Sequence, residues 1–122
     1  MLLPENKPKA AHLLRGESAE RQACDFLISQ GLTLVVRNFR CIHGELDLIM
    51  KDGETLVIVE VRFRKNAKYG SALESVDVRK QTKISAATEF YLNTLEGEMP
   101  RIRFDVMGIS GNGELQWVQN AF

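Results

Sequence analysis

Gly44 to Arg64 read GELDLIMKDGETLVIVEVRFR, and this stretch decides the fold. Two runs with strand character flank a turn signal at Asp52-Gly53, which predicts a β-hairpin with a two-residue loop. Successive side chains of a strand point to opposite faces. We therefore expect one face of the hairpin to be fully apolar and to receive a helix. This face consists of Leu46, Leu48, Met50, Val57, Val59 and Val61.

The other face of the hairpin carries charged residues at the end far from the turn. With that loop, Glu45 lies opposite Glu60, and Asp47 is its diagonal neighbour, about 7–8 Å away at the backbone. Three carboxylates this close repel one another unless a cation is present. The corner is therefore either a metal site or a set of solvated strand-end acids, one of them paired with Arg62.

Length and composition indicate one domain. The chain has 122 residues, of which 44% are hydrophobic, enough for a single core. We expect residues 1–15 to be a polar, partly mobile lead-in and residues 16–122 to form the domain. No apolar run approaches the roughly 18 residues that cross a bilayer. Two cysteines are too few for a disulfide framework or a zinc motif. We therefore expect a cytoplasmic protein that does not bind membranes.

Positive charge gathers directly after the hairpin. Lys+Arg and Asp+Glu number 16 each, but from Arg62 to Lys83 seven basic residues stand against two acidic ones. Such a segment is either a solvated face or a surface that holds a phosphate backbone, and its place beside the acids adds weight to the second without excluding the first. The residues of interest are Arg62, Arg64, Lys65, Lys68, Lys80 and Lys83.

The remaining elements follow from periodicity and from turn signals. Where a strand is followed by a helix and a second strand, the helix connects the two strands by a right-handed crossover, and the two strands are parallel. We therefore predict a single α/β domain with a mixed β-sheet flanked by helices. Around the hairpin we expect a helix over Ser18–Ser29, a strand from Leu32 towards Arg40, a basic loop with Gly70, a helix capped by Asp77 with Ile84, Ala87, Tyr91 and Leu95 buried, a strand over Arg101–Ile109, and a short strand around Leu115 and Trp117.

An acid on one strand and acid-x-basic on the next resembles the restriction-endonuclease-like superfamily, PD-(D/E)XK. This resemblance implies a restriction-endonuclease-like core of the Holliday-junction-resolvase type, with Mg²⁺ or Mn²⁺ and cleavage of DNA. More closely, the chain from about Ser18 to Trp117 resembles the uncharacterised bacterial YraN family. The residues that carry this likeness are Glu20, Ala23, Phe26-Leu27, Gly31, Asn38-Phe39-Arg40, Gly44 to Ile49, Val59 to Arg62, Gly70, Glu74-Ser75-Val76, Lys80 and Arg103 to Val106.

The resemblance assigns roles to individual residues. Asp47 matches the first metal-binding acid, Glu60 the second, and Glu20 the helix-borne glutamate that often completes such sites. Val61 matches the residue that adds its backbone carbonyl to the metal. Arg62 occupies the place of the motif lysine, and this departs from the pattern. An arginine keeps its charge and is a poor base, although it can clamp a phosphate with two hydrogen bonds.

Arg62 leaves three interpretations open. The attacking water needs no side-chain base, or Lys80 or Lys83 substitutes for the lysine, or catalysis is lost. We therefore expect a metal-dependent endonuclease that selects DNA by structure rather than by sequence, or alternatively a non-catalytic nucleic-acid-binding or interaction module. A purely structural acidic and basic surface would bind no divalent cation. A homodimer is expected by analogy with resolvases.

Four further residues have two interpretations each. Glu45 is a ligand or neighbour of the metal, or an exposed strand-end residue. Glu20 is an inward-facing site residue or an ordinary flank of the helix's apolar stripe, and apart from the resemblance the second is favoured. His43 is a proton donor beside the acids, or a structural residue. Asp105 supports the site or the fold. Phe63 and Tyr69 are the aromatic residues placed to stack on bases.

Overall fold

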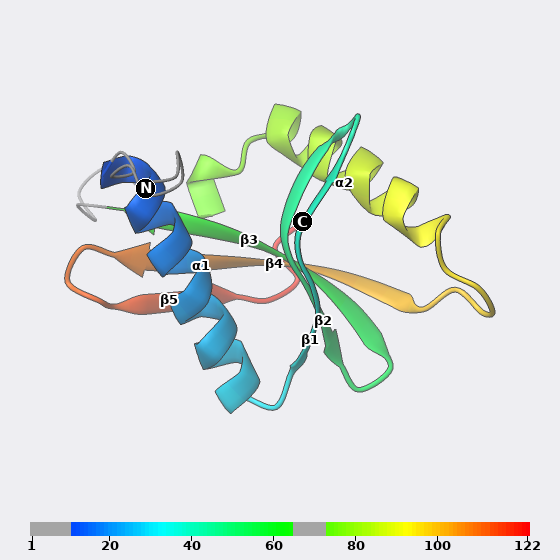
Figure 1. Ribbon diagram of the computed structural model, residues 1–122, viewed down its shortest axis with the longest axis horizontal. Coiled ribbons are helices and arrows are strands. Elements are labelled where there is room, and N and C mark those ends of the chain that lie inside the picture. Colours follow the sequence, from blue (N-terminus) through cyan, green and yellow to red (C-terminus); the bar gives the residue numbers. More distant parts are fainter. Residues whose placement is uncertain (1–10, 65–72) are drawn as a thin grey trace, which may run out of the picture.

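The structure, a computed structural model, describes residues 11–64 and 73–122 of the chain (Figure 1). Its elements follow the predicted order of helix, three strands, helix and two strands. Residues 1–10 of the predicted lead-in, and most of the predicted basic loop with Gly70, lie outside the described residues. The elements are α1 (Ala11–Ser29), β1 (Thr33–Cys41), β2 (Gly44–Asp52), β3 (Thr55–Arg64), a 3-10 turn (Leu73–Ser75), α2 (Val78–Leu92), β4 (Arg101–Ser110) and β5 (Leu115–Val118).

The five strands form one sheet in the order β1-β2-β3-β4-β5. Neighbouring strands are antiparallel except β3 and β4, which are parallel and are joined through α2. Their register runs from Thr55 opposite Arg101 to Arg64 opposite Ser110. The predicted mixed sheet within a single α/β domain is confirmed. Both parallel strands end at the same edge of the sheet, and the charged end of β3 lies there.

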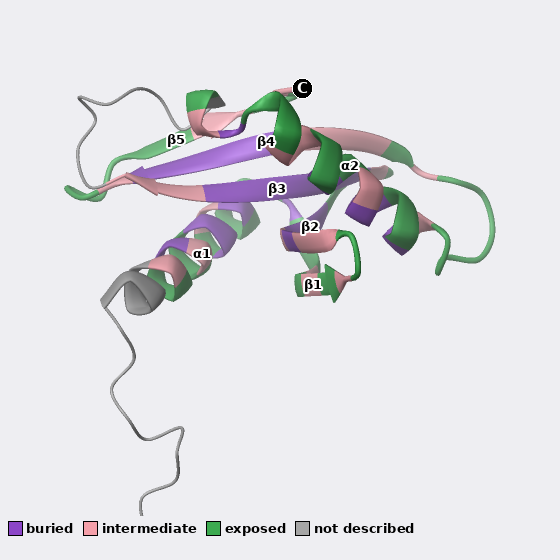
Figure 2. Cartoon of the chain, turned by 90° about the horizontal axis from the view of Figure 1, so that it is seen from above, coloured by how far each residue is buried: buried purple, intermediate pink, exposed green. Residues whose placement is uncertain are grey.

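The central strand β3 is buried on both faces, and every residue from Leu56 to Val61 is inaccessible to solvent or nearly so. The predicted apolar face packs against α1, as expected. The opposite face is apolar too and packs against α2, so the prediction of one helix-covered face was incomplete. Figure 2 shows the helices on the two sides of the sheet. The second face shows in the sequence because a strand buried on both faces is a continuous apolar run. Its residues are Ile49, Leu56 and Ile58.

The hairpin of β2 and β3 turns one residue later than predicted. Asp52 pairs with Thr55, so the loop is Gly53-Glu54. Gly53 has a φ of 60°, and glycine takes the positive φ that the first central position of such turns requires. The faces are unchanged, but the pairing moves. Leu48 pairs with Val59, and the same register continued places Asp47, rather than Glu45, opposite Glu60.

Leu46 packs on the α2 side of the sheet, which corrects its predicted place beside Leu48. The pairing of β2 with β3 ends at Leu48, and beyond it the hairpin of β1 and β2 curls towards α2 (Figure 1). At its tip the rings of His43 and Phe90 lie 6.0 Å apart. The curl turns the strand about its axis, so strict alternation no longer predicts the face.

The helix boundaries differ from prediction at one end of each helix. α1 begins at Ala11, upstream of the predicted start at Ser18. Asp77 caps α2 as predicted, because its Oδ1 accepts a hydrogen bond of 2.9 Å from the backbone N–H of Lys80. Leu95 lies beyond the end of α2 and is 37% exposed, so its predicted burial was wrong. Neither described helix is long and apolar enough to cross a membrane. The buried residues of α2 are Ile84, Ala87, Thr88 and Tyr91.

Candidate metal centre

Asp47 lies where β2 and β3 separate. The last residue pair between the two strands is Leu48 with Val59. Beyond this pair, the side chain of Asp47 forms the contact between β2 and β3. Asp47 Oδ2 accepts a hydrogen bond of 2.9 Å from the backbone N–H of Val61. On the other side of β2, the register of β1 places Asn38 opposite Asp47. Asp47 is therefore held between two strands, with one oxygen anchored to β3.

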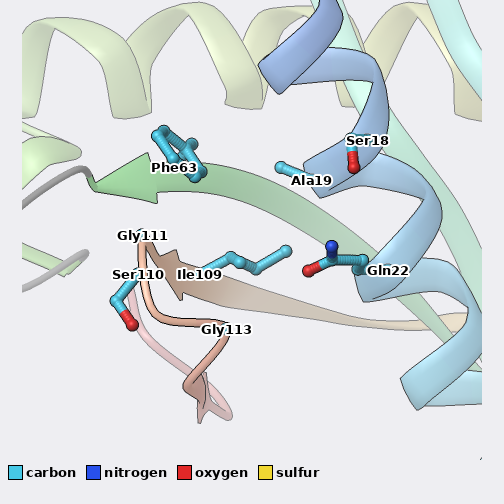
Figure 3. Close-up of a pocket in the computed structure, with 8 residues that line it drawn as sticks. All are labelled: Ser18, Ala19, Gln22, Phe63, Ile109, Ser110, Gly111 and Gly113. Carbon is cyan, nitrogen blue, oxygen red and sulfur yellow. The ribbon is translucent and has the colours of Figure 1, made fainter.

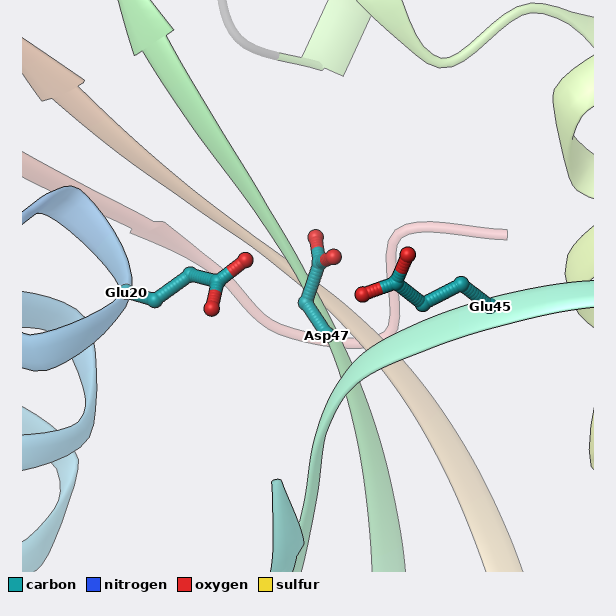
Figure 4. Close-up of side chains that lie close together, drawn as sticks. All are labelled: Glu20, Glu45 and Asp47. Atoms are coloured by element: carbon teal, nitrogen blue, oxygen red, sulfur yellow. The ribbon is translucent and has the colours of Figure 1, made fainter. Parts of the chain in front are cut away.

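Two more carboxylates meet Asp47. Glu20 comes from α1 and Glu45 from β2, and one oxygen of each of the three side chains lies within 4.8 Å of the others. Figure 4 shows the three side chains pointing towards one another. Glu45 is also 3.6 Å from Arg40 Nε, its partner on β1. The structure thus places Glu20 and Glu45, which had two interpretations each, at the acidic site.

Asn38 joins this group, although the sequence did not single it out as a site residue. With its amide nitrogen towards the acids, it donates to Glu45 Oε1 at 3.1 Å and to Glu20 Oε2 at 3.0 Å. Its φ is 52°, a left-handed conformation that asparagine tolerates better than most residues. The one signal in the sequence is an asparagine inside a strand, where this residue is depleted.

Glu60 lies beside these acids on β3, and its side chain is only 3% exposed. Its Oε1 is 3.2 Å from a guanidinium nitrogen of Arg62 and 3.5 Å from Lys80 Nζ. Its Oε2 is buried and has no hydrogen-bond partner among the described residues. Glu60 is not one of the three acids that lie within 4.8 Å of one another. We call Glu20, Glu45, Asp47 and Glu60 together the acid corner.

Burial and repulsion between neighbouring acids raise the pKa values of Glu20, Asp47 and Glu60. Burial, and then the charge of Asp47, raises the pKa of Glu60 to about 7. Burial and the charges of Asp47 and Glu45 raise the pKa of Glu20 to about 7, against the lowering effect of the Asn38 hydrogen bond. Burial also raises the pKa of Asp47, although the N–H of Val61 and the charge of Arg62 oppose it. A cation would reverse these shifts.

The residues of the acid corner fit a hard divalent cation. All of their donors are oxygens, which Mg²⁺ and Mn²⁺ prefer, and Mg²⁺ needs only one or two carboxylates because it keeps several waters. Glu20, Glu45 and Asp47 converge closely enough to share an ion. The unpartnered Oε2 of Glu60 is a buried acceptor that the described residues leave unsatisfied. This combination of convergence and an orphaned acceptor is what a cation site requires.

The predicted basic residues are only partly gathered at the acid corner. Arg62 and Lys80 contact Glu60 directly. Arg64 follows on the same face of β3, and its Nε is buried without a hydrogen-bond partner among the described residues. Lys83 lies instead beside the tip of the hairpin of β1 and β2. The Cβ of Lys83 is 3.9 Å from the position that a Cβ on Gly44 would occupy. Lys65 and Lys68 lie outside the described residues.

Asp105 forms a separate polar centre. It is fully buried and accepts four hydrogen bonds of 2.9 Å, two from Arg103 and one each from Trp117 Nε1 and the backbone N–H of Asn120. None of its partners belongs to the acid corner. Asp105 therefore ties β5 and the chain end to β4, which is the structural one of its two interpretations. His43 contacts the ring of Phe90 rather than an acid.

A pocket of ≈ 260 Å³ lies between α1 and the ends of β3 and β4. Figure 3 shows Phe63 and Ile109 on the sheet side of it and Ala19 on the helix side. Phe63, which the sequence placed as a candidate for base stacking, is the aromatic residue of its lining. Tyr69 lies outside the described residues. The other lining residues are Ser18, Gln22, Ser110, Gly111 and Gly113.

Residues 19–109 match the model described as "Uncharacterised protein family UPF0102". The chain belongs to this family. It is the family that the residue pattern resembled under the name YraN, and the matched segment contains the whole acid corner. A UPF0102 protein of Nitrosomonas eutropha is 49% identical over 88% of this chain and 92% of its own length. Those of Pseudomonas fluorescens and Nitrosospira multiformis are 48% and 50% identical, over 94% and 89% of this chain and 98% and 92% of their own lengths.

Proposed function

We propose that this UPF0102 protein is a metal-dependent nuclease that hydrolyses DNA phosphodiesters at the acid corner. The observation that carries the proposal is the convergence of Glu20, Glu45 and Asp47 next to the buried Glu60, which contacts Arg62 and Lys80. When bound there, Mg²⁺ or Mn²⁺ would polarise the phosphoryl group and lower the pKa of a water molecule. We further propose that residues 16–122 form one domain of the restriction-endonuclease-like type.

Asp47 and Glu60 are the principal ligands in this proposal, with Glu20 and Glu45 supplying further oxygens. Val61 adds its backbone carbonyl. The N–H and C=O of one strand residue point to the same edge of the strand, and the N–H of Val61 points at Asp47. The carbonyl therefore faces the same side, where β2 no longer pairs with β3.

The cations beside the acids hold the phosphate. Arg62 uses one nitrogen on Glu60, and its planar fork leaves other N–H groups for a non-bridging oxygen. Lys80 reaches the same oxygen of Glu60 from α2. The motif has a lysine at the position of Arg62 on β3. In this chain Lys80 offers the ammonium group of such a lysine from α2 instead. Arg64, Lys65, Lys68 and Lys83 extend this surface along the DNA backbone in the proposal.

The pocket with Phe63 supports selection by DNA structure. An aromatic ring that lines a hollow at the end of β3 offers a stacking surface to any unpaired base. Stacking discriminates little between bases, so branched or single-stranded DNA is favoured over a particular sequence. By analogy with resolvases we propose a homodimer, and by composition a cytoplasmic protein.

The competing proposal is a nucleic-acid-binding or interaction module without catalysis. One observation favours it: Arg62 stands in the place of the motif lysine and is paired with Glu60 at 3.2 Å. A guanidinium cannot take a proton from water at any working pH. In that case the acid corner would bind a cation and DNA without cutting it.

Cleavage of branched and single-stranded DNA in Mg²⁺ and in Mn²⁺ separates the two proposals. We expect cleavage by the wild type, and loss of cleavage in the variants Asp47→Asn and Glu60→Gln. Asp25→Asn, at an exposed acid of α1, is the matched control and should cut like the wild type. Cleavage that survives both site substitutions would exclude the acid corner. DNA binding without cleavage in either metal would favour the module, and activity gained by Arg62→Lys would identify the arginine as the cause.

A further inference from the structure

We propose that Asn38 is a further side-chain ligand of the cation site, through an amide that turns over when the cation binds. The inference rests on the proposed metal centre and adds a residue that the nuclease motif does not contain. It starts from the position of Asn38, whose amide lies within hydrogen-bond distance of both Glu20 and Glu45.

Without a cation, the amide nitrogen serves the two acids. A side-chain amide carries two N–H donors on nitrogen and an acceptor oxygen at nearly the same reach. Its two donors match the two acceptors, Glu45 Oε1 at 3.1 Å and Glu20 Oε2 at 3.0 Å. Hydrogen bonds to charged acceptors are among the stronger ones. Asn38 therefore holds Glu20 and Glu45 in place of a positive charge.

With a cation, the opposite orientation becomes the favourable one. A half-turn of the planar amide places its oxygen where the nitrogen was, without movement of the backbone. An oxygen against two carboxylates is repulsive by itself, but around a divalent cation it completes an all-oxygen ligand set, and amide carbonyls are common ligands of hard cations.

An independent observation indicates that something is missing at the acid corner. Glu60 is almost fully buried next to Asp47, and its Oε2 has no hydrogen-bond partner in the described part of the chain. A cation that Asn38 coordinates together with Glu20, Glu45, Asp47 and Glu60 would give this acceptor a partner.

Nuclear magnetic resonance of the ¹³C,¹⁵N-labelled full chain during titration with MgCl₂ tests the turn directly. We expect the side-chain N–H signals of Asn38, assigned by their absence in Asn38→Ala, to shift and exchange faster with solvent. Its carbonyl carbon should shift in parallel. The side-chain amide of Asn112, in the turn before β5, is the internal control. Unchanged Asn38 signals at a Mg²⁺ concentration that saturates calorimetric binding would overturn the inference.

Mn²⁺ binding measured by electron paramagnetic resonance gives a second test. Asn38→Ala should weaken binding about tenfold or more, whereas Asn38→Asp keeps an oxygen and should bind at least as tightly as the wild type. Arg40→Gln makes the same change in net charge without adding a ligand and should tighten binding less than Asn38→Asp. Wild-type affinity in Asn38→Ala would contradict the proposal, as would equal tightening in Arg40→Gln and Asn38→Asp.

The outcomes separate this inference from the proposed function. If Mg²⁺ shifts the Asn38 signals but the protein cuts no DNA, Asn38 is supported as a ligand and the proposed nuclease activity is refuted. If the protein cuts DNA but Mg²⁺ leaves the Asn38 signals unchanged, the nuclease activity is supported and Asn38 is refuted as a ligand. No binding of either cation at any concentration refutes both.

Discussion

Two buried acids of the same sheet, Asp105 on β4 and Glu60 on β3, are treated differently by the fold. Both are at most 2% exposed. Both oxygens of Asp105 are bonded, with Arg103 contacting each of them. One carboxylate oxygen of Glu60 contacts Arg62 and Lys80, whereas the other has no hydrogen-bond partner among the described residues. Burying a charge is costly unless partners satisfy it, so Asp105 is complete within the chain and Glu60 is not.

This difference distinguishes a structural acid from one kept for a ligand. The partners of Asp105 come from β4, β5 and the chain end, and they join those segments. The partners of Glu60 are two cations on one oxygen, which leaves its pKa at about 7. A complete hydrogen-bond set predicts a role in stability. An incomplete set beside other acids predicts a role in binding.

The largest expected effect is the loss of stability in Asp105→Asn. Breaking a buried ion pair while leaving its partner charged costs about 3–5 kcal/mol, which lowers Tm by roughly 10–20 °C in a domain of this size. Thermal unfolding followed by circular dichroism measures it. Glu60→Gln is the matched substitution at a similarly buried acid, and at pH 5, where Glu60 is protonated in the fold, it should change the free energy of unfolding by less than about 1 kcal/mol. Equal losses in both variants would remove the distinction.

The next effect is a fall in stability with rising pH in the cation-free protein. Glu20 and Glu60 have pKa values of about 7 in the fold against 4.5 ordinarily. Between these values the folded chain holds protons that the unfolded chain has lost, so stability decreases as pH rises from about 4.5 to 7 and is then level. For Glu60 the decrease is on the order of 3 kcal/mol.

Urea unfolding in a chelator at several pH values from 5 to 8 measures this slope. Glu60→Gln has no proton to lose at that position, and it should remove the part of the decrease that Glu60 contributes, while the part from Glu20 remains. A stability that rises with pH over this window would contradict the raised pKa values. So would a slope that Glu60→Gln leaves unchanged.

A smaller effect is the recovery of stability at pH 8 when a divalent cation is added. A ligand at ten times its Kd stabilises the fold by about 1.4 kcal/mol, measured as a rise in Tm with MgCl₂ or MnCl₂. Asp47→Asn should abolish the rise, because Asp47 lies among all the other acids. Asp25→Asn, an exposed acid of α1, should keep it. A rise that persists in Asp47→Asn would place the cation elsewhere.

Much of the fold follows from local signals. The hairpin, the cap at Asp77 and the crossover between β3 and β4 depend on residues close together in the sequence or on a rule of handedness. The place of Leu46 does not follow in this way. It depends on the curl of β2 beyond its last pair with β3, and alternation assumes a strand without such a curl.

The candidate site divides in the same way. Asp47 and Glu60 stand out because acids are unusual in an apolar hairpin. Glu20 was assigned to the site only through the family resemblance. The sequence around Ala19 and Ala23 does not indicate which flank of α1 faces β2. Asn38 was missed because its role depends on the register of β1, which brings it opposite Asp47. Contacts between distant segments are set by pairing, and single-sequence patterns do not contain them.

The smallest expected effect compares two lysines of α2. Lys80→Met removes one of the two cations from Glu60, so the pKa of Glu60 should rise further and the pH-dependent loss of stability should extend to higher pH. Because Lys80 is partly exposed, the cost at pH 8 is only about 0.5–1 kcal/mol. Lys83→Met, one turn along at the hairpin tip, should lie within about 0.5 kcal/mol of the wild type. If both variants shift the pH profile of stability equally, Glu60 responds to the summed positive charge of α2 and not to Lys80 in particular. That result would refute the role proposed for Lys80 at the acid corner.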